Sequence, residues 1–192
     1  VDRLRDYCTR WQASLFGRYD ALARVEAARK GEKDRSLEQM LDTEYGRVWI
    51  QTLPVKWRFA TDPEKKGIDQ KWYAADYDDK DWGAILTDLG VGWKAQGYHD
   101  ADADAFGWYR MNIYVPDNTN PWRGENWYVC FEAVDEDAYV FINGKKAFEH
   151  SCESTGLKPD QIRETPFVFK ANEFLSPGGN NKFAVGVYNR KM

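Results

Sequence analysis

Three aspartates stand at alternate positions in residues 99–110, whose sequence is His-Asp-Ala-Asp-Ala-Asp-Ala-Phe-Gly-Trp-Tyr-Arg. Asp100, Asp102 and Asp104 match the first half of an EF-hand calcium loop, in which alternate carboxylates face one ion. That loop also needs a glycine directly after the third aspartate and a glutamate at its end, and this chain has alanine and methionine there. The spacing therefore excludes an EF-hand.

The same carboxylates are poor candidates for acid–base catalysis. Hydrolysis of a glycosidic bond needs two carboxyl groups across a sugar pocket, with environments that separate their pKa values. Alternate aspartates on one loop share an environment, and their mutual repulsion favours solvation. We predict a solvated polar loop and no catalytic residues, with a looser structural calcium site as the open alternative.

Histidine and cysteine are too sparse to build a metal centre or a disulfide framework. The chain has two histidines, His99 and His150, and three cysteines, Cys8, Cys130 and Cys152. Their positions match no zinc-ligand spacing. We predict no cofactor and no metal site apart from the calcium alternative, and the disulfide status of the cysteines stays open.

Composition excludes several other classes of function. The formal net charge is −4 and the pI is about 5.3, with no basic stripe, so nucleic acid is not an expected partner. No apolar run approaches the ~20 residues that span a bilayer, so a membrane is not expected either. No nucleophile-elbow, phosphate-loop or dinucleotide motif is present. The start of the chain lacks both an initiator Met and a signal-peptide pattern, which suggests a processed product or a piece of a longer protein.

Residues 1–46 are predicted to be a helical segment, the tail of an upstream domain or a linker. Their apolar residues recur at spacings of three and four, which is typical of an amphipathic helix. These residues are Leu4, Tyr7, Cys8, Trp11, Leu15, Tyr19, Leu22 and Val25. The apolar face they form must pack on the rest of the chain or on a partner.

From residue 47 to 192 the pattern is that of β-structure. Residues 108–115 alternate with a period of two, which indicates a strand with one buried face. The Asn143-Gly144 pair suits a two-residue hairpin turn. Further strands are predicted at 127–134, 138–142, 145–150, 166–170 and 182–188, and around Trp49, Trp57 and Trp72. About eight short strands without helices between them predict a sandwich or jelly roll, and an aromatic content of 16% fits such a core.

The order of short motifs along residues 48–190 resembles the sugar-binding, jelly-roll domain at the start of family-2 glycoside hydrolases, such as β-galactosidases and β-glucuronidases. The most specific motifs are Gly-Trp-Tyr-Arg at 107–110 and Ala-Val-Asp-Glu-Asp-Ala-Tyr-Val-Phe-Ile-Asn-Gly at 133–144. The resemblance implies a mainly β, galactose-binding-like β-sandwich. It also implies that the catalytic carboxylates lie on a separate (β/α) barrel, which alone needs about 250 residues.

Two loops reach the sugar in the enzymes of that family, one before the Gly-Trp-Tyr-Arg strand and one after the hairpin. The position at which they offer an aspartate after the hairpin corresponds to Cys152 here, which departs from the pattern. Trp122 lies in a polar loop and is the tryptophan least needed by a core. The candidate ligand-binding residues are Tyr98, His99, Asp102, Asp104, Trp122, His150 and Glu153.

The function hypothesis is a non-catalytic, carbohydrate-binding accessory module of a larger glycoside hydrolase or other polysaccharide-degrading protein. Its expected partners are a β-linked saccharide and a catalytic domain of the same polypeptide. The resemblance also leads us to expect export to an extracellular or periplasmic location. The alternative is a structural interaction domain that packs on its neighbours and binds no sugar.

Overall fold

The computed structural model describes residues 53–100, 104–115, 117, 127–131 and 133–190. The predicted helical segment at 1–46 and the strand predicted around Trp49 lie outside these residues. So do Asp102 and Trp122, two of the candidate ligand-binding residues. No helix in the described part of the chain is long and apolar enough to cross a membrane.

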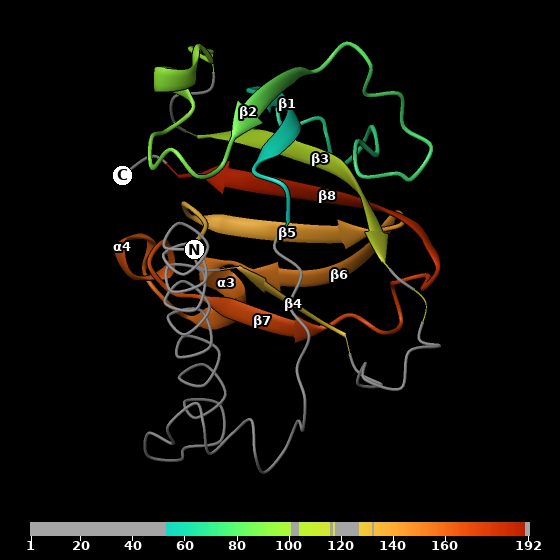
Figure 1. The fold of residues 1–192 in the computed structure, drawn as a ribbon. Helices are drawn as coiled ribbons and strands as arrows, with labels where there is room; N and C mark the ends of the chain where they lie inside the picture. Colours follow the sequence, from blue (N-terminus) through green and yellow to red (C-terminus); the bar gives the residue numbers. More distant parts are fainter. Residues whose placement is uncertain (1–52, 101–103, 116, 118–126, 132, 191–192) are drawn as a thin grey trace, which may run out of the picture.

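The described residues form two antiparallel sheets (Figure 1). The larger sheet has six strands in the order β2 (Gly83–Leu86), β1 (Lys56–Asp62), β3 (Ala105–Val115), β8 (Gly179–Asn189), β5 (Asp137–Ile142) and β6 (Lys145–His150). The smaller sheet pairs β4 (Tyr128–Phe131) with β7 (Phe167–Lys170). Three single-turn helices complete the elements: η2 (Lys94–Gln96), α3 (Cys152–Thr155) and α4 (Pro159–Ile162). The prediction of a mainly β chain with antiparallel sheets is confirmed.

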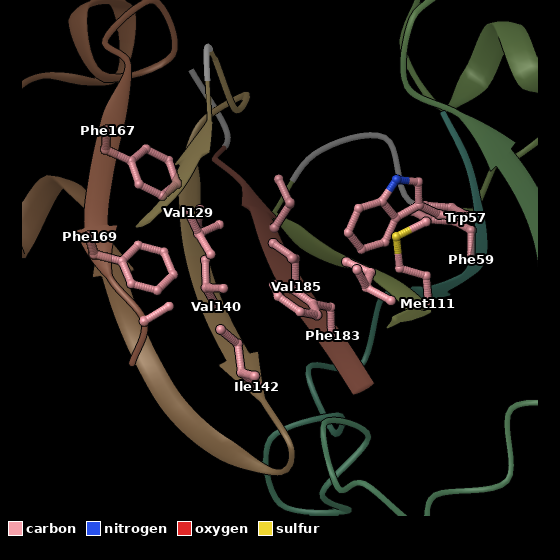
Figure 2. Packing of buried hydrophobic residues seen from close by; sticks show 14 of the residues in the cluster. Trp57, Phe59, Met111, Val129, Val140, Ile142, Phe167, Phe169, Phe183 and Val185 are labelled. Carbon is pink, nitrogen blue, oxygen red and sulfur yellow. The ribbon is translucent and has the colours of Figure 1, made fainter. Parts of the chain in front are cut away.

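The main core lies between the two sheets (Figure 2). Alternate residues of each strand face it, because successive side chains in a strand point to opposite faces. From the larger sheet, Phe59, Val140 and Val185 are almost fully buried, and the smaller sheet closes over them with Phe167 and Phe169. The two sheets thus pack as a β-sandwich around an apolar, ring-rich interior.

The hairpin between β5 and β6 turns at the predicted dipeptide. Asn143 and Gly144 have φ angles of 51° and 79°, both in the left-handed region that a type I′ turn needs. The Asn143 side chain also donates to the carbonyl of Phe174 and accepts from the amide of Lys182. The hairpin is therefore fixed to the neighbouring strand β8 as well as closed on itself.

The outer face of the larger sheet is covered as well, which the sequence pattern did not predict. Trp108 and Arg110 lie on the face of β3 opposite the main core, and both are fully buried. Residues 63–82 cross this face as a series of turns, so the strand predicted around Trp72 is wrong. The Trp72 ring instead packs on the rings of Trp82 and Trp108, with centroids 5.4 and 6.3 Å apart.

The Gly-Trp-Tyr-Arg motif supports this covering segment and the loop before β3. A side chain at Gly107 would meet the Trp93 ring, because a Cβ there lies only 2.4 Å from it. The Trp108 indole donates to Asp62 at 3.1 Å, and the same Asp62 carboxylate accepts from the amides of Lys66 and Gly67 at 2.8 Å. The motif thus contributes to packing within the fold, against Trp93 and the turn that follows Asp62.

Arg110 holds the middle of the covering segment. Its guanidinium donates to the Asp79 carboxylate at 2.9 Å and to the backbone carbonyls of Trp72, Ala74 and Tyr77. The side chain is fully buried, so these bonds replace its hydration. A buried cation with a carboxylate and three carbonyls is stable only while all its partners stay in place.

We expect Arg110→Met to lower the free energy of unfolding by about 3 to 5 kcal/mol, because three carbonyls lose their donor in a closed site and Asp79 keeps only Lys182, at 3.5 Å. Urea denaturation followed by tryptophan fluorescence measures this loss. Arg58→Met is the matched control, since Arg58 is exposed and donates to two carbonyls of the same segment, those of Lys80 and Trp82. A control variant destabilised as much as Arg110→Met would contradict the special role of the buried guanidinium.

Candidate functional site

Four strand ends of the larger sheet meet at one end of the sandwich, on the left in Figure 1. Strands β3 and β5 begin there, while β6 and β8 end there, since neighbouring strands run antiparallel. The loop before β3 and the segment after the hairpin both arrive at this end. These are the two places where the sequence predicted most of the ligand-binding residues.

Arg190 is the charged centre of this end. Its Nε donates to the buried Asp137 carboxylate at 2.8 Å, and its Nη2 donates to both oxygens of Glu153 at 2.7 Å. Asp137 also accepts from the amide of Cys152 at 2.8 Å. The hydrogen bonds that Arg190 donates to Asp137 and Glu153 raise the pKa of Arg190, and the Arg190 guanidinium lowers the pKa of Glu153. The cluster therefore joins β5, β8 and α3.

Glu136 adds a third acidic group beside Arg190. The side chain is almost fully buried and accepts a hydrogen bond from the backbone amide of Arg190. Burial raises the pKa of this carboxyl, and the negative charges of Asp135 and Asp137 raise it further. Because Glu136 is enclosed by protein, we assign it to the packing of the strand end and not to ligand binding.

A second polar network lies beside Arg190, on the same face of the sheet. The Tyr188 hydroxyl donates to the Asp104 carboxylate, and Lys65 donates to the same oxygen at 2.5 Å. The Lys65 ammonium also lies 5.0 Å from the centre of the Tyr188 ring, and the Arg190 guanidinium lies 5.5 Å from it. Both cations thus lie within the distance at which the π-electrons of a ring attract a positive charge.

Three half-buried rings continue this surface across the strands. The Phe106 ring lies 5.0 Å from that of Tyr188 and 5.8 Å from that of Tyr139. Beyond Tyr139, an ion pair between Lys146 and Glu149 closes the far edge. We call this surface the aromatic–polar patch; its residues are Lys65, Asp104, Phe106, Tyr139, Lys146, Glu149, Glu153, Tyr188 and Arg190.

The patch combines flat apolar ring faces with fixed donors and acceptors. A pyranose ring presents C–H groups on its face and hydroxyls at its rim, so such a surface can stack the face and hydrogen-bond the rim. Among the described residues, no three His, Cys, Asp or Glu side chains gather as metal ligands. Asp100 and Asp104 point to separate partners, Thr61 and Lys65.

The structure divides the candidate residues between the patch and the packing. Asp104 and Glu153 belong to the patch, and His99 is exposed on the loop before β3. Tyr98 lies on the side of the main core, where its hydroxyl donates to the Ala84 carbonyl at 2.9 Å and its ring packs on Phe59. Two of the candidate residues therefore lie in the patch, and ligand contact by every candidate residue stays a prediction.

Several patch residues escaped the sequence analysis. Tyr139 and Tyr188 lie in strands that were predicted, yet their shared face depends on the register between β5 and β8. Lys65 belongs to the covering segment, and Arg190 follows the last predicted strand. Alternation within each strand predicts which side chains share a face of that strand. It does not predict which strands pair with one another.

His150 occupies the inner side of the same strand end. It is 4% exposed, its ring stacks on Phe167 with centroids 4.4 Å apart, and its Nε2 finds no hydrogen-bond partner among the described residues. Burial lowers the pKa of His150, although the carbonyls of Ile162 and Thr165 and the charge of Asp137 act in the opposite direction. The ring is a neutral part of the core.

No family model matches the chain. Solved structures do match the sandwich. A β-glucuronidase from Ruminococcus gnavus, in complex with uronic deoxynojirimycin, superposes with a TM-score of 0.55 at 21% identity and is matched over 77% of this chain. A β-glucuronidase from an uncultured Clostridium sp. gives 0.58 at 20% identity over 76%. The described residues share the fold of part of these proteins. This chain spans only 22% and 23% of their lengths, so the likeness concerns a region much smaller than either whole chain.

The buried histidine makes a pH-dependent contribution to stability. Its folded-state pKa is below the ordinary value of 6.5, so the unfolded chain binds the proton more tightly. Stability should therefore fall as the pH drops below 6.5 towards the folded-state pKa, by up to about 1.4 kcal/mol per pH unit for one group.

We expect His150→Phe to remove this part of the pH dependence, because a phenyl ring can stack on Phe167 without titrating. Urea midpoints between pH 7.5 and 5 should fall less steeply for this variant than for the wild type. His99→Gln, which changes the exposed second histidine, should keep the wild-type slope. Identical slopes for the wild type and His150→Phe would show that His150 does not titrate as a buried neutral group.

Proposed function

We propose that the sandwich is a non-catalytic domain of a larger carbohydrate-active protein, and that it holds a β-linked saccharide against the aromatic–polar patch. Within this proposal the sandwich is a galactose-binding-like jelly roll, and the reacting carboxylates lie on another domain of the same polypeptide. The shared fold with part of two β-glucuronidases supports the family assignment. The small share of their length that this chain spans supports the non-catalytic role.

The observation that carries the proposal is the arrangement of the patch itself. Tyr188, Tyr139 and Phe106 are half-buried rings on one sheet face, and ion pairs border them on both sides. Their neighbours on that face, Trp108 and Phe141, are covered by residues 63–82. The rings beyond this cover are the ones left for a ligand to stack on.

Binding by such a surface should be weak. Sugar hydroxyls exchange hydrogen bonds with water for hydrogen bonds with protein, and the net gain of each exchange is small. A dissociation constant in the millimolar range, equivalent to about 4 kcal/mol, is a reasonable expectation for one stacked pyranose. A domain that frames a substrate for a neighbouring catalytic site needs no tighter binding.

A structural interaction domain is the second candidate, and a separate observation favours it. Leu89 and Val91 are 52% and 49% exposed at the tip of the loop that follows β2. Apolar side chains at an exposed tip suit contact with another protein surface. In this reading the sandwich packs on its neighbours, and the aromatic–polar patch has no ligand.

Titration of the chain with methyl β-glycosides and β-linked disaccharides, followed by NMR, separates the two candidates. The wild type should bind at least one of them at millimolar concentration. Tyr188→Leu should weaken that binding about threefold or more, because the ring face is lost while an apolar side chain remains. Tyr114→Leu is the matched control, since Tyr114 is an exposed tyrosine at the far end of β3.

Circular dichroism and thermal midpoints show whether both tyrosine variants stay folded. If the wild type binds no β-linked saccharide at millimolar concentration, the carbohydrate-binding proposal is wrong and the interaction domain is the better account. Equal losses in the two variants would place the saccharide elsewhere on the chain.

A further inference from the structure

We infer that the aromatic–polar patch selects neutral saccharides and disfavours those that carry a carboxylate. This inference rests on the proposed function, because it concerns the ligand of the same surface. It follows from how the charges of the patch are paired. The patch contains cations, which would suggest an acidic ligand, yet the charge of each cation is already balanced by a carboxylate partner.

Each cation of the patch already has a carboxylate partner. Lys65 lies 2.5 Å from Asp104, and Lys146 lies 2.5 Å from Glu149. Arg190 contacts two carboxylates, Glu153 at 2.7 Å and the buried Asp137. An acidic ligand that approached one of these cations would also lie beside the carboxylate that pairs with it, and that carboxylate would repel it.

The balance of charge also opposes an anion. Within the patch, the three cations Lys65, Lys146 and Arg190 balance the three carboxylates of Asp104, Glu149 and Glu153. The buried Asp137, which pairs with Arg190 from outside the patch, leaves one net negative charge. The neighbouring Glu136 can only add to that charge. A like charge at contact distance in water corresponds to roughly a fivefold loss of affinity at low salt.

A neutral sugar meets no such penalty. The carboxylates of Glu149 and Glu153 keep lone pairs that can accept from sugar hydroxyls, and hydrogen bonds to ionised groups are the stronger kind. The ammonium groups of Lys65 and Lys146 can donate to ring or hydroxyl oxygens without leaving their partners. Paired charges thus act as fixed dipoles for a ligand that brings no charge of its own.

Glu153 is the side chain through which this selectivity can be changed. It is 66% exposed, whereas the other partner of Arg190, Asp137, is fully buried. Replacing Glu153 with glutamine removes one negative charge and leaves Arg190 held by Asp137. The outward side of the guanidinium then becomes available to a ligand carboxylate in the bidentate geometry that arginine favours.

The test compares methyl β-D-glucoside with methyl β-D-glucuronide, which differ only in a hydroxymethyl and a carboxylate group. NMR titration of the full chain at pH 7 and low salt should give a dissociation constant about fivefold larger for the glucuronide. Raising the salt to 0.3 M should narrow this difference, because screening weakens charge repulsion at the surface. The glucoside affinity should stay nearly constant.

In Glu153→Gln we expect glucuronide binding to strengthen about fivefold, so that the preference for the glucoside is lost. Glu173→Gln is the matched control. Glu173 is an exposed carboxylate at the opposite end of the sandwich, next to Phe174, whose carbonyl bonds to the hairpin residue Asn143. This control makes the same change in net charge and should leave the preference intact.

Each outcome decides between the two proposals. Equal or tighter binding of the glucuronide by the wild type would overturn the inference and leave the carbohydrate-binding function standing. A preference that Glu153→Gln leaves unchanged would also overturn it, since the selectivity would then arise away from Arg190. Failure of both methyl glycosides and of the neutral disaccharides to bind would overturn the proposed function, and the inference with it.

Discussion

The buried guanidinium of Arg110 is the constraint on which the outer half of the sandwich depends. Residues 63–82 have no strand or helix of their own. Arg110 donates hydrogen bonds to three of their carbonyls and to the carboxylate of Asp79. This contact turns an irregular segment into a cover for Trp108 and Phe141. A cation serves here because backbone carbonyls in a closed site require donors that an apolar side chain cannot supply.

The position of the covering segment determines where a ligand can approach the outer face of the larger sheet. The covering segment leaves the sheet at Asp62, whose carboxylate fixes the first turn through two amides and the Trp108 indole. That turn places Lys65 beside Tyr188, so the cover forms one border of the aromatic–polar patch. At the end of the strands, Arg190 joins the end of β8 to α3. The patch is therefore a product of packing on both sides of it.

Most strands of the larger sheet could be predicted from the sequence, because apolar and polar residues alternate along a strand that has one face in a core. Alternation and turn chemistry correctly located the strands at 108–115, 138–142 and 182–188 and the Asn143-Gly144 turn.

The covering segment was not predicted, because its aromatic residues suit a strand equally well and only the contacts of Arg110 distinguish the two conformations. The pairing of Arg190 with Asp137 joins residues far apart in sequence, and no local pattern encodes it. The His150 ring is buried and stacks on Phe167, a contact between distant residues that alternation along one strand does not predict.

We place the bound saccharide on the outer face of the larger sheet, on the aromatic–polar patch beyond the covering segment. Aromatic side-chain NMR resonances of the chain, followed as a neutral β-linked saccharide is added, test this location directly. We expect the ring signals of Phe106, Tyr139 and Tyr188 to shift together along one binding curve while those of Trp57 and Phe59 in the main core stay fixed. Shifts confined to rings outside the patch, such as Tyr98 and Trp93, would contradict it.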